Sequence, residues 1–344
     1  MPNAARASRA ARLGPKATPP LVARVFAELA DGRFHSGEAL ARALGVSRSA
    51  VWKAAAALRA QGSALHAVPN RGYRLSCGSE PLDPAKIRAQ LAREVRERIA
   101  SIEAAWAIGS TNTALLERAN PGSGSAEVLL AEYQSAGRGR RGRAWLAPPG
   151  GAICLSMSWT FREVPQDLGA LGLVIGVCAL RALREHGVGG VSLKWPNDLL
   201  VDGRKLGGVL IDLRAESAGA ACVVIGIGLN VALGAELLRQ IAASGTAATD
   251  LASVAQAVPA RNALAAALVS ACVPGLIEFE RQGLKPFIED WRAADALRGR
   301  AVNVSAADGV ARGIARGIDL RGALMVETPH GMRRFISGDV TVRP

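Results

Sequence analysis

The chain has 344 residues, 49% of them hydrophobic, and a formal net charge of +13. This length is enough for about two or three domains with well-buried cores. No apolar run approaches the roughly 20 residues that a membrane-spanning helix needs, and the N-terminus lacks the apolar segment of a signal peptide.

Cysteine and histidine usage gives no sign of a cross-linked or metal-bound protein. The five cysteines are odd in number and lie far apart, mostly within apolar runs, and the four histidines are scattered. This pattern is typical of reduced thiols in a cytoplasmic protein rather than of disulfides or a structural zinc site.

The positive charge is concentrated near the N-terminus. Residues 1–78 contain twelve Lys or Arg and three acidic residues, which accounts for +9 of the net +13. A basic module on a nearly balanced body predicts polyanion binding at that end. We expect residues 1–20, which are basic and rich in Ala, to form a disordered arm; a mitochondrial-type transit peptide is the alternative.

Residues 21–78 have the pattern of a winged helix. Apolar spacing predicts a first helix over 21–30, and Ser36 and Ser47 are placed to cap a second and a third helix. A hairpin with its turn at 69–72 follows. Two helices joined by a short turn that contains glycine form a helix-turn-helix, and the hairpin adds the wing.

In such a fold the second helix of the motif enters the major groove of DNA with its N-terminal end foremost. The residues placed to contact DNA are Ser47, Arg48, Ser49 and Lys53 in the helix and Arg71 and Arg74 in the wing. After Lys53 the helix is rich in Ala, which favours phosphate and shape readout over base contacts. We expect Trp52 to pack in the core or in a dimer interface. A winged helix used for protein contact or internal regulation is the alternative.

The body of the chain alternates strand-like and helix-like segments. The expected elements are an amphipathic helix over 84–99, a strand and a turn at Gly109 before a helix capped by Ser110 or Thr111, strands over 127–134 and 152–159, a buried helix over 168–187, and three successive strands in VSLKWPND, KLGGVLIDLR and CVVIGIGLNV. This order predicts an α/β domain with a mixed sheet. Short strand-like segments with turns at 308–309, 319–322 and 330–331 indicate a small β-barrel at the C-terminus.

The segment GRGRRGR at 137–143 places three glycines among four arginines. Glycine lets a ligand approach the backbone closely, and guanidinium groups bind carboxylates or phosphates through paired hydrogen bonds. Four like charges this close together repel one another unless something negative lies between them. We therefore interpret the segment as part of a site for an anionic ligand; a solvated basic loop is the alternative.

Several familiar catalytic patterns do not fit. The segment after GRGRRG contains Pro-Pro-Gly-Gly and cannot be the helix that a dinucleotide fold requires, and no phosphate-binding P-loop motif occurs. A nucleophile elbow is also missing. The chemistry must therefore depend on stabilisation of charge rather than on a protein nucleophile.

Two further basic segments complete the predicted site. In KWPND (194–198), Asn197 and Asp198 are suited to hydrogen-bond an adenine edge or a ribose, or to bind Mg²⁺. In KLGG (205–208), Lys205 combines a point charge with bare backbone, which suits a reacting carboxylate and α-phosphate.

These motifs, with Ser-Thr-Asn at 110–112 and GIGLN at 226–230, resemble those of the bacterial bifunctional biotin–protein ligases and biotin-operon repressors. The resemblance covers about residues 21–340. It implies an α+β multidomain chain with a winged helix over 21–78, a class II synthetase-like mixed-sheet ligase domain over 84–296, and an SH3-like β-barrel over 297–344. It also implies a two-step reaction in which biotin and MgATP give biotinyl-5′-AMP, which then acylates an acceptor lysine.

The resemblance assigns roles to individual residues. Lys205 and Arg138 are the implied catalytic residues, and Asp198 is a candidate Mg²⁺ ligand. The implied biotin-binding residues are Ser110, Thr111, Asn112, Gln134, Gly137, Arg138, Arg140, Lys205, Gly208 and Gly226. The implied ATP-binding residues are Arg138, Arg140, Arg141, Arg143, Trp145, Lys194, Asn197, Asp198, Lys205 and Asn230. Arg312 and Arg316 either face the ligase site or have structural roles.

The implied substrates are biotin and ATP with Mg²⁺, and no tightly bound metal is expected. The implied partners are the biotin carboxyl carrier domain of a carboxylase, double-stranded operator DNA, and a second copy of the chain, with dimerisation promoted by biotinyl-5′-AMP. No membrane partner is expected. The alternatives are a ligase whose winged helix does not repress, a transcription factor that senses a biotin-like ligand without catalysis, and a lipoate ligase.

Overall fold

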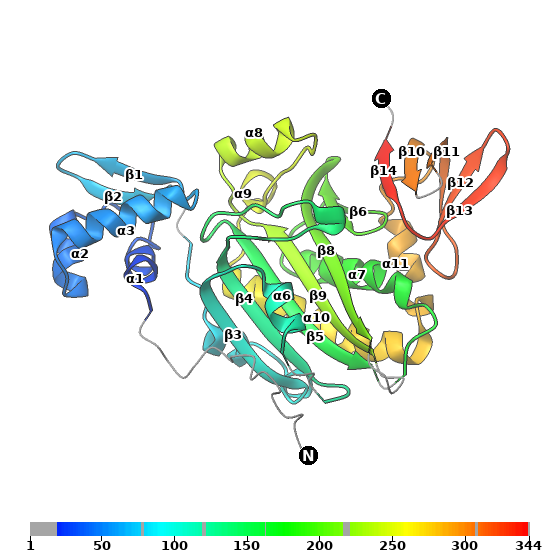
Figure 1. The fold of residues 1–344 in the computed structure, drawn as a ribbon, viewed down its shortest axis with the longest axis horizontal. Helices are drawn as coiled ribbons and strands as arrows, with labels where there is room; N and C mark the ends of the chain where they lie inside the picture. The colour runs from blue at the N-terminus through cyan, green and yellow to red at the C-terminus, as the bar shows by residue number, and fades with distance from the viewer. Residues whose placement is uncertain are drawn as a thin grey trace, which may run out of the picture.

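The computed structural model describes residues 19–76, 79–118, 122–161, 163–215, 221–306 and 309–342. An N-terminal group of helices with a hairpin lies at one side of a central sheet, and a smaller sheet lies at the other side (Figure 1). The arm expected over residues 1–20 falls almost wholly outside the described residues, as do Cys77 and Asp308.

The N-terminal unit is the predicted winged helix. Its elements are α1 (Leu21–Glu28), α2 (Gly37–Leu44), α3 (Arg48–Ala60), β1 (Leu65–Val68) and β2 (Gly72–Leu75). Ser36 and Ser47 cap α2 and α3 as predicted, each accepting a hydrogen bond from the backbone N–H three residues on. Gly45 ends α2 in the left-handed conformation, with φ of 65°. The predicted helix-turn-helix and hairpin are therefore confirmed.

The wing is fixed to the helices through His35. Its backbone N–H donates to Tyr73 O at 2.9 Å and its carbonyl accepts from Tyr73 N at 2.8 Å. A Cβ on Gly72 would lie 2.0 Å from His35 O, and the φ of Gly72 is +93°. Only glycine fits there without displacing the hairpin.

The segment between the winged helix and the sheet is bound to the central domain. Leu82 N donates to Glu132 Oε1 at 2.6 Å, and Glu132 is ion-paired with Arg261 at 2.8 Å. Asn262 Nδ2 donates to Pro81 O at 3.0 Å. These buried polar groups satisfy one another, so the segment has a defined path rather than that of a loose tether.

The single helix predicted over 84–99 is wrong. The chain forms α4 (Pro84–Ala89) and α5 (Arg93–Arg96), and β3 begins at Ile99. Ile87, Leu91, Val95 and Ile99 are all buried, so the spacing of four is a real apolar pattern. Packing of these side chains against the core does not need a continuous helix, and the pattern alone could not show the break.

The central sheet has seven strands in the order β3-β4-β5-β9-β8-β7-β6. They are β3 (Ile99–Ile108), β4 (Ala126–Gln134), β5 (Ala152–Phe161), β6 (Val191–Lys194), β7 (Asp198–Val201), β8 (Arg204–Ala215) and β9 (Ala221–Asn230). Only β3 and β4 pair in parallel, which confirms a mixed sheet. The segment VSLKWPND is not one strand as predicted: it contains β6, a reversal with a cis Trp195–Pro196 bond, and the start of β7.

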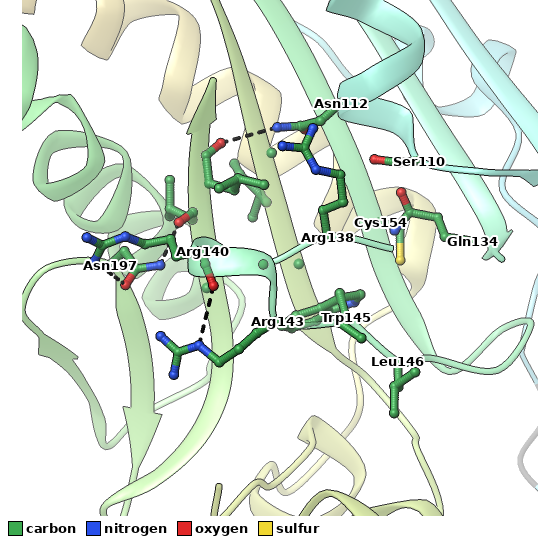
Figure 2. A pocket seen from close by; sticks show the side chains of 18 of the residues that line it. Ser110, Asn112, Gln134, Arg138, Arg140, Arg143, Trp145, Leu146, Cys154 and Asn197 are labelled. Atoms are coloured by element: carbon green, nitrogen blue, oxygen red, sulfur yellow. Dashed lines mark hydrogen bonds between the residues drawn. The ribbon is translucent and has the colours of Figure 1, made fainter. Parts of the chain in front are cut away.

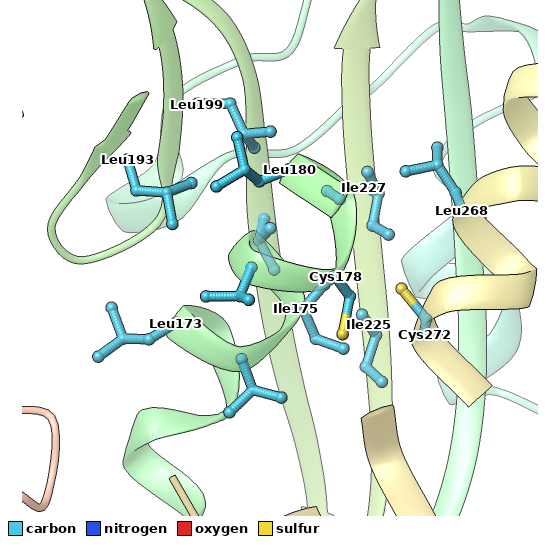
Figure 3. Packing of buried hydrophobic residues seen from close by; sticks show 14 of the residues in the cluster. Leu173, Ile175, Cys178, Leu180, Leu193, Leu199, Ile225, Ile227, Leu268 and Cys272 are labelled. Carbon is cyan, nitrogen blue, oxygen red and sulfur yellow. The ribbon is translucent and has the colours of Figure 1, made fainter. Parts of the chain in front are cut away.

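Two long helices cover one face of this sheet. α7 (Leu171–Glu185) follows the 3₁₀ turn η2 (Leu168–Ala170), confirming the predicted buried helix, and packs against α10 (Arg261–Gln282). Figure 3 shows Cys178 of α7 and Cys272 of α10 meeting Ile225 and Ile227 of β9 in this core.

The sequence analysis did not predict α10. This helix is long and apolar enough to cross a membrane by composition, with a mean hydropathy of 1.6, but 67% of that stretch is buried inside the protein. It is therefore a core helix. The remaining helical elements are α6 (Thr111–Leu116), η1 (Arg140–Gly142), α8 (Ala235–Ala243), α9 (Leu251–Val254), η3 (Lys285–Phe287) and α11 (Ile288–Ala293).

The C-terminal unit is the expected small antiparallel β-domain. Its strands are β10 (Ala301–Ala306), β11 (Gly309–Ile318), β12 (Leu324–Thr328), β13 (Gly331–Phe335) and β14 (Asp339–Val342), in the order β13-β12-β11-β10-β14. It is attached to the central sheet where Trp195 Nε1 donates to Gly322 O at 3.0 Å. Leu193 of β6 also exchanges backbone hydrogen bonds with residues 294 and 296, at 2.7 and 2.9 Å.

Candidate active site

A cavity of about 360 Å³ lies on the face of the sheet that α7 and α10 leave free (Figure 2). The predicted ligand residues that line it are Ser110, Thr111, Asn112, Gln134, Arg138, Arg140, Arg143, Trp145, Asn197, Lys205, Gly208, Gly226 and Asn230. Gly137, Arg141, Lys194 and Asp198 do not line it. The structure thus brings most of the predicted site together, from segments more than a hundred residues apart.

Alternation along β9 explains why the cavity exists. Val223, Ile225, Ile227 and Leu229 belong to the core with α7 and α10, so the residues between them point to the other face. There, a Cβ on Gly226 would lie 2.4 Å from Asn112 Oδ1, and one on Gly228 would lie 2.5 Å from the Trp145 ring. The two glycines give Asn112 and Trp145 the space they occupy at the cavity wall.

One end of the cavity is a polar floor. Thr111 N and Oγ1 both donate to Gln134 Oε1, at 2.8 and 3.1 Å. Asn112 Nδ2 donates to Asp212 Oδ2 at 2.9 Å, and Ser156 Oγ bonds Thr111 Oγ1 at 2.6 Å. Ser110 caps α6, accepting from Thr113 N at 3.4 Å. These bonds fix the rotamers of the floor, which therefore presents a fixed set of donors and acceptors.

The walls above this floor are largely apolar, and Cys154 is one of them. Burial raises the pKa of the Cys154 thiol to about 11, so the group is neutral at physiological pH. A protonated, buried thiol behaves as a small hydrophobic group and not as a nucleophile. Beside it lie Trp145, Leu146 and Leu155.

Lys205 stands at the other end with a carboxylate beside it. Its Nζ is 2.6 Å from Asp198 Oδ1, and a Cβ on Gly208 would lie 3.2 Å from that Nζ. The backbone of Lys205 is held as well, because its N–H donates to Ala247 O at 2.8 Å and its carbonyl accepts from Thr249 N at 2.9 Å. The backbone of Lys205 is therefore fixed on both sides, and its amine is held by Asp198.

Asp198 was predicted to touch ATP or Mg²⁺, but in the structure it is the ion-pair partner of Lys205. Among the residues that the structure describes, no three His, Cys, Asp or Glu side chains gather as a metal cage. A single carboxylate fits a Mg²⁺ ion whose other ligands are water and substrate phosphates.

We call residues 137–143 the arginine loop. Its four arginines spread apart: Arg138 lies 3.4 Å from Asp212 and Arg140 donates to Asn197 Oδ1 at 3.3 Å. Arg141 and Arg143 each bind one oxygen of Asp339, on β14, at 2.9 Å. Carboxylates of the protein therefore offset the repulsion among these arginines, so a bound anionic ligand is not the only group that can do so.

Burial lowers the pKa of Arg140, while Asp339 acts in the opposite direction. Guanidinium groups remain protonated even so. Burial likewise lowers the pKa of Lys194, which Asp198 partly offsets. Arg140 thus brings a poorly solvated charge to the cavity, where it attracts anions more strongly than in water.

Two residues predicted to lie around adenine or the metal line the cavity and also hold the protein's own backbone. Asn197 Nδ2 donates to Val209 O at 2.7 Å, and Asn230 Nδ2 donates to Thr249 O at 2.9 Å. Both amides hold the strands and loop around Lys205. Arg316 pairs with Glu327, and neither it nor Arg312 lines the cavity, so of the two alternatives given for them the structural role fits better.

Sequence reasoning missed part of the lining. The additional residues are Gly139, Ala144, Leu146, Cys154, Leu155, Ser156, Val209, Leu210, Ile227, Gly228, Ile241, Ser244, Thr246 and Ala248. The alternation of polar residues on β5 could have revealed Ser156. The stretch from 241 to 248 has no motif, and only its pairing with Lys205 places it at the site.

The candidate DNA-binding residues form a separate surface. Arg48, Ser49 and Lys53 are exposed on α3, whereas Ser47 uses its hydroxyl to cap the helix. The guanidinium groups of Arg71 and Arg74 lie over the Phe34 ring, at 4.2 and 4.9 Å. Trp52 is 62% exposed, so it does not pack in the core of its own chain, and the other expected position, a dimer interface, stays a prediction.

Comparisons with known proteins agree with this architecture. Family descriptions match an HTH domain over residues 24–74, the Biotin/lipoate A/B protein ligase family over 106–230, and a Biotin protein ligase C terminal domain over 298–343. The bifunctional ligase/repressor BirA of Salmonella typhimurium is 37% identical over 92% of this chain and 95% of its own. That of Escherichia coli is 37% identical over 93% of this chain and 96% of its own.

A solved structure shares much of this fold. The biotin protein ligase from Aquifex aeolicus in complex with biotin and ATP is 26% identical, with a TM-score of 0.55, covering 72% of this chain and 99% of its own. The chain therefore belongs to the biotin protein ligase family, in the branch that joins the ligase to an N-terminal helix-turn-helix domain.

Proposed function

We propose that the protein is an ATP-dependent biotin–protein ligase that biotinylates the carrier domain of a biotin-dependent carboxylase. The observation that carries this proposal is the fixed Lys205–Asp198 pair, 2.6 Å apart, at one end of a cavity whose other end is a polar floor. An elongated ligand with a hydrogen-bonding head, an apolar middle and a carboxylate tail matches this distribution.

Biotin has that distribution. Its ureido group would meet the hydroxyl and amide groups of Ser110, Thr111, Asn112 and Gln134, and its rings and chain would lie between Trp145 and Cys154. A site that is built to hydrogen-bond a polar head rejects analogues that lack it.

The carboxylate tail would then reach Lys205, with ATP on the side of the arginine loop. A carboxylate oxygen forms a bond to the α-phosphorus as the bond to pyrophosphate breaks. Both reactants are anions, so the fixed charges of Lys205, Arg138 and Arg140 lower the cost of bringing them together and stabilise charge that develops on the phosphate. Asp198, beside Lys205, would be the carboxylate that holds the Mg²⁺ of MgATP, which would neutralise phosphate charge.

The second step needs the adenylate to be protected from water. In transfer, the acceptor lysine amine attacks the acyl carbon and AMP leaves. The arginine loop contributes Arg138, Arg140 and Arg143 to the cavity lining and is tied to β14 by Asp339. We propose that the loop retains the mixed anhydride until the carrier domain docks.

The test separates the two half-reactions. With wild-type protein, biotin should support exchange of labelled pyrophosphate into ATP, and adding a carrier domain should yield one biotin per domain by mass spectrometry. Lipoate in place of biotin should support neither. If lipoate supports pyrophosphate exchange and biotin does not, the protein is a lipoate ligase. If biotin binds but supports no pyrophosphate exchange, the protein is a sensor that lacks catalysis.

We also propose that the protein represses transcription as a dimer that biotinyl-5′-AMP promotes. The supporting observation is the winged helix, whose α3 exposes Arg48 and Lys53 within the most basic part of the chain. Two such helices, related by two-fold symmetry, would meet a palindromic operator.

Selection of duplexes from a random pool, with and without biotin plus MgATP, tests this second function. A palindrome enriched only with both ligands is expected. No enriched sequence in either condition would leave a ligase whose winged helix does not repress.

We further propose that the protein acts in the cytoplasm. The described cysteines are free thiols, which fits a reducing compartment.

A further inference from the structure

The outer face of α3 carries one large apolar side chain. Trp52 is 62% exposed, while Val51, Ala54, Ala55 and Leu58 of the same helix are buried in the winged-helix core. Trp52 therefore lies on the side of α3 that faces away from its own domain. Exposing an indole to water costs free energy, so the position calls for an explanation.

The neighbours of Trp52 indicate the chemistry of its partner. Arg48, Ser49 and Lys53 share its exposed face, and in the part of the chain that the structure describes neither of the two cations has an ion-pair partner. Toward the C-terminal end this face continues with Ala56 and Ala60, which are also exposed. Two cations beside this ring give the face a positive charge, which suits a polyanion such as DNA.

The same face has the shape of a helix that enters a groove. Alanines at 56 and 60 keep the helix narrow, so its backbone can come close to base edges. The N-terminal end of α3, where Arg48 and Ser49 stand, favours phosphate through its unpaired N–H groups and the helix dipole. Trp52 is one turn further along, and it is the largest side chain on this face.

We infer that Trp52 reads a base of the operator, by packing its indole against the C5-methyl group of a thymine in the major groove. The inference rests on the proposed repressor function. The thymine methyl is the apolar group that the major groove presents, and aromatic side chains can contact it. The indole Nε1–H can in addition donate to an acceptor on a neighbouring base edge.

The test uses the full chain with biotin and MgATP, and the duplex that wild-type protein selects from a random pool. Trp52→Ala should weaken binding to that duplex by about tenfold per half-site. Binding to an unrelated duplex at the same salt concentration should change less than about twofold, because phosphate contacts remain. A repeated selection with Trp52→Ala should lose base preference at one thymine position of each half-site.

Removal of a single methyl group sharpens the test. Deoxyuridine in place of that thymine should weaken wild-type binding by about threefold, the value of one buried carbon. It should leave Trp52→Ala unaffected, because the contact is already lost. Trp52→Phe, which keeps an apolar ring but not the N–H, should keep the sensitivity to deoxyuridine.

Lys53→Ala is the matched control on the same face. It should weaken binding to the specific and the unrelated duplex equally, and lower the slope of log affinity against log salt by about one per half-site. Thermal unfolding of all variants should match wild type, since the side chains are exposed.

Three outcomes would overturn the inference. If Trp52→Ala selects the same sequence as wild-type protein and binds it with the same affinity, the indole does not contribute to sequence recognition. Loss of the ligand-promoted dimer by sedimentation, without DNA present, would make this face a protein interface. If wild-type protein selects no sequence at all, the repressor function fails and the inference with it, whereas the first two outcomes leave that function intact.

Discussion

The cavity and the outer face of α3 both offer cations to a negatively charged partner, but they hold them differently. In the cavity, Lys205 is paired with Asp198 and Arg138 with Asp212. On α3, Arg48 and Lys53 stand in solvent, with no ion pair among the described residues. Fixed cations suit a reaction, because they need no reorganisation as charge develops. Free cations suit DNA, whose affinity comes from the release of counterions.

The largest expected contrast between the two regions is their response to salt. Raising the salt concentration from about 50 to 200 mM should weaken DNA binding by about a thousandfold or more, if the dimer neutralises about six phosphates. The KM for biotin should change by less than about twofold, because partly buried ion pairs are poorly screened. Fluorescence anisotropy and the exchange assay measure both on one preparation. Equal salt sensitivity would remove the distinction between the two regions.

Lys205→Ala should have the next largest effect. Removing the amine should slow biotin-dependent pyrophosphate exchange by about a hundred- to a thousandfold, the cost of one preorganised group that stabilises charge. Arg204→Ala, whose side chain is exposed on the preceding residue, is the matched control and should retain full exchange. Wild-type exchange rates in Lys205→Ala would show that this lysine is not catalytic.

Gly226→Ala tests the polar floor. Its Cβ would lie 2.4 Å from Asn112 Oδ1 and force that side chain away from Asp212 and Ser156. We expect the substitution to weaken the free energy of biotin binding by about 1–3 kcal/mol, which corresponds to a five- to roughly hundredfold rise in the KM for biotin. Gly109→Ala is the control, since no atom lies within 4 Å of its Cβ. Equal KM values in the two variants would place biotin elsewhere.

Asp339→Asn should have the smallest effect. It removes the carboxylate that holds Arg141 and Arg143, and these groups are partly exposed, so each pair is worth at most about 1 kcal/mol. We expect the KM for ATP to rise by about five- to tenfold and trypsin to cleave the arginine loop faster. Glu327→Gln, which breaks the remote pair with Arg316, should change neither. Unchanged proteolysis would show that β14 does not hold the loop.

Local patterns predicted the winged helix and the strands that carry the cavity. Capping serines and alternation depend on neighbouring residues, so the sequence predicted the caps at Ser36 and Ser47 and a strand over 152–159, which in the structure extends to 161. Asp339 could not be predicted, because its partners lie 196 and 198 residues away in the chain. The same holds for Thr246 and Ala248, which reach the cavity only through pairing beside Lys205.

The other differences between prediction and structure arose where one sequence pattern is compatible with two different local structures. The spacing of four at Ile87, Leu91 and Val95 fits one helix or two, and only the tertiary packing decides between them. Trp52 was expected to pack in the core or in a dimer interface, because large aromatic residues are usually well buried. Its exposed position follows from the register of α3, in which Val51 and Ala55 take the buried face.

The contact between Phe26 and Trp106 limits how the protein can be divided. The ring centroids of Phe26, in α1, and Trp106, in β3, lie 5.4 Å apart. The DNA-binding unit therefore covers part of one edge of the central sheet. A ligase fragment made by cutting the chain before Ser79 would leave this tryptophan in water. We expect such a fragment to self-associate unless Trp106 is replaced by a polar residue. An engineer who wants a minimal biotinylation tool from this chain should therefore redesign that edge before removing the first 78 residues.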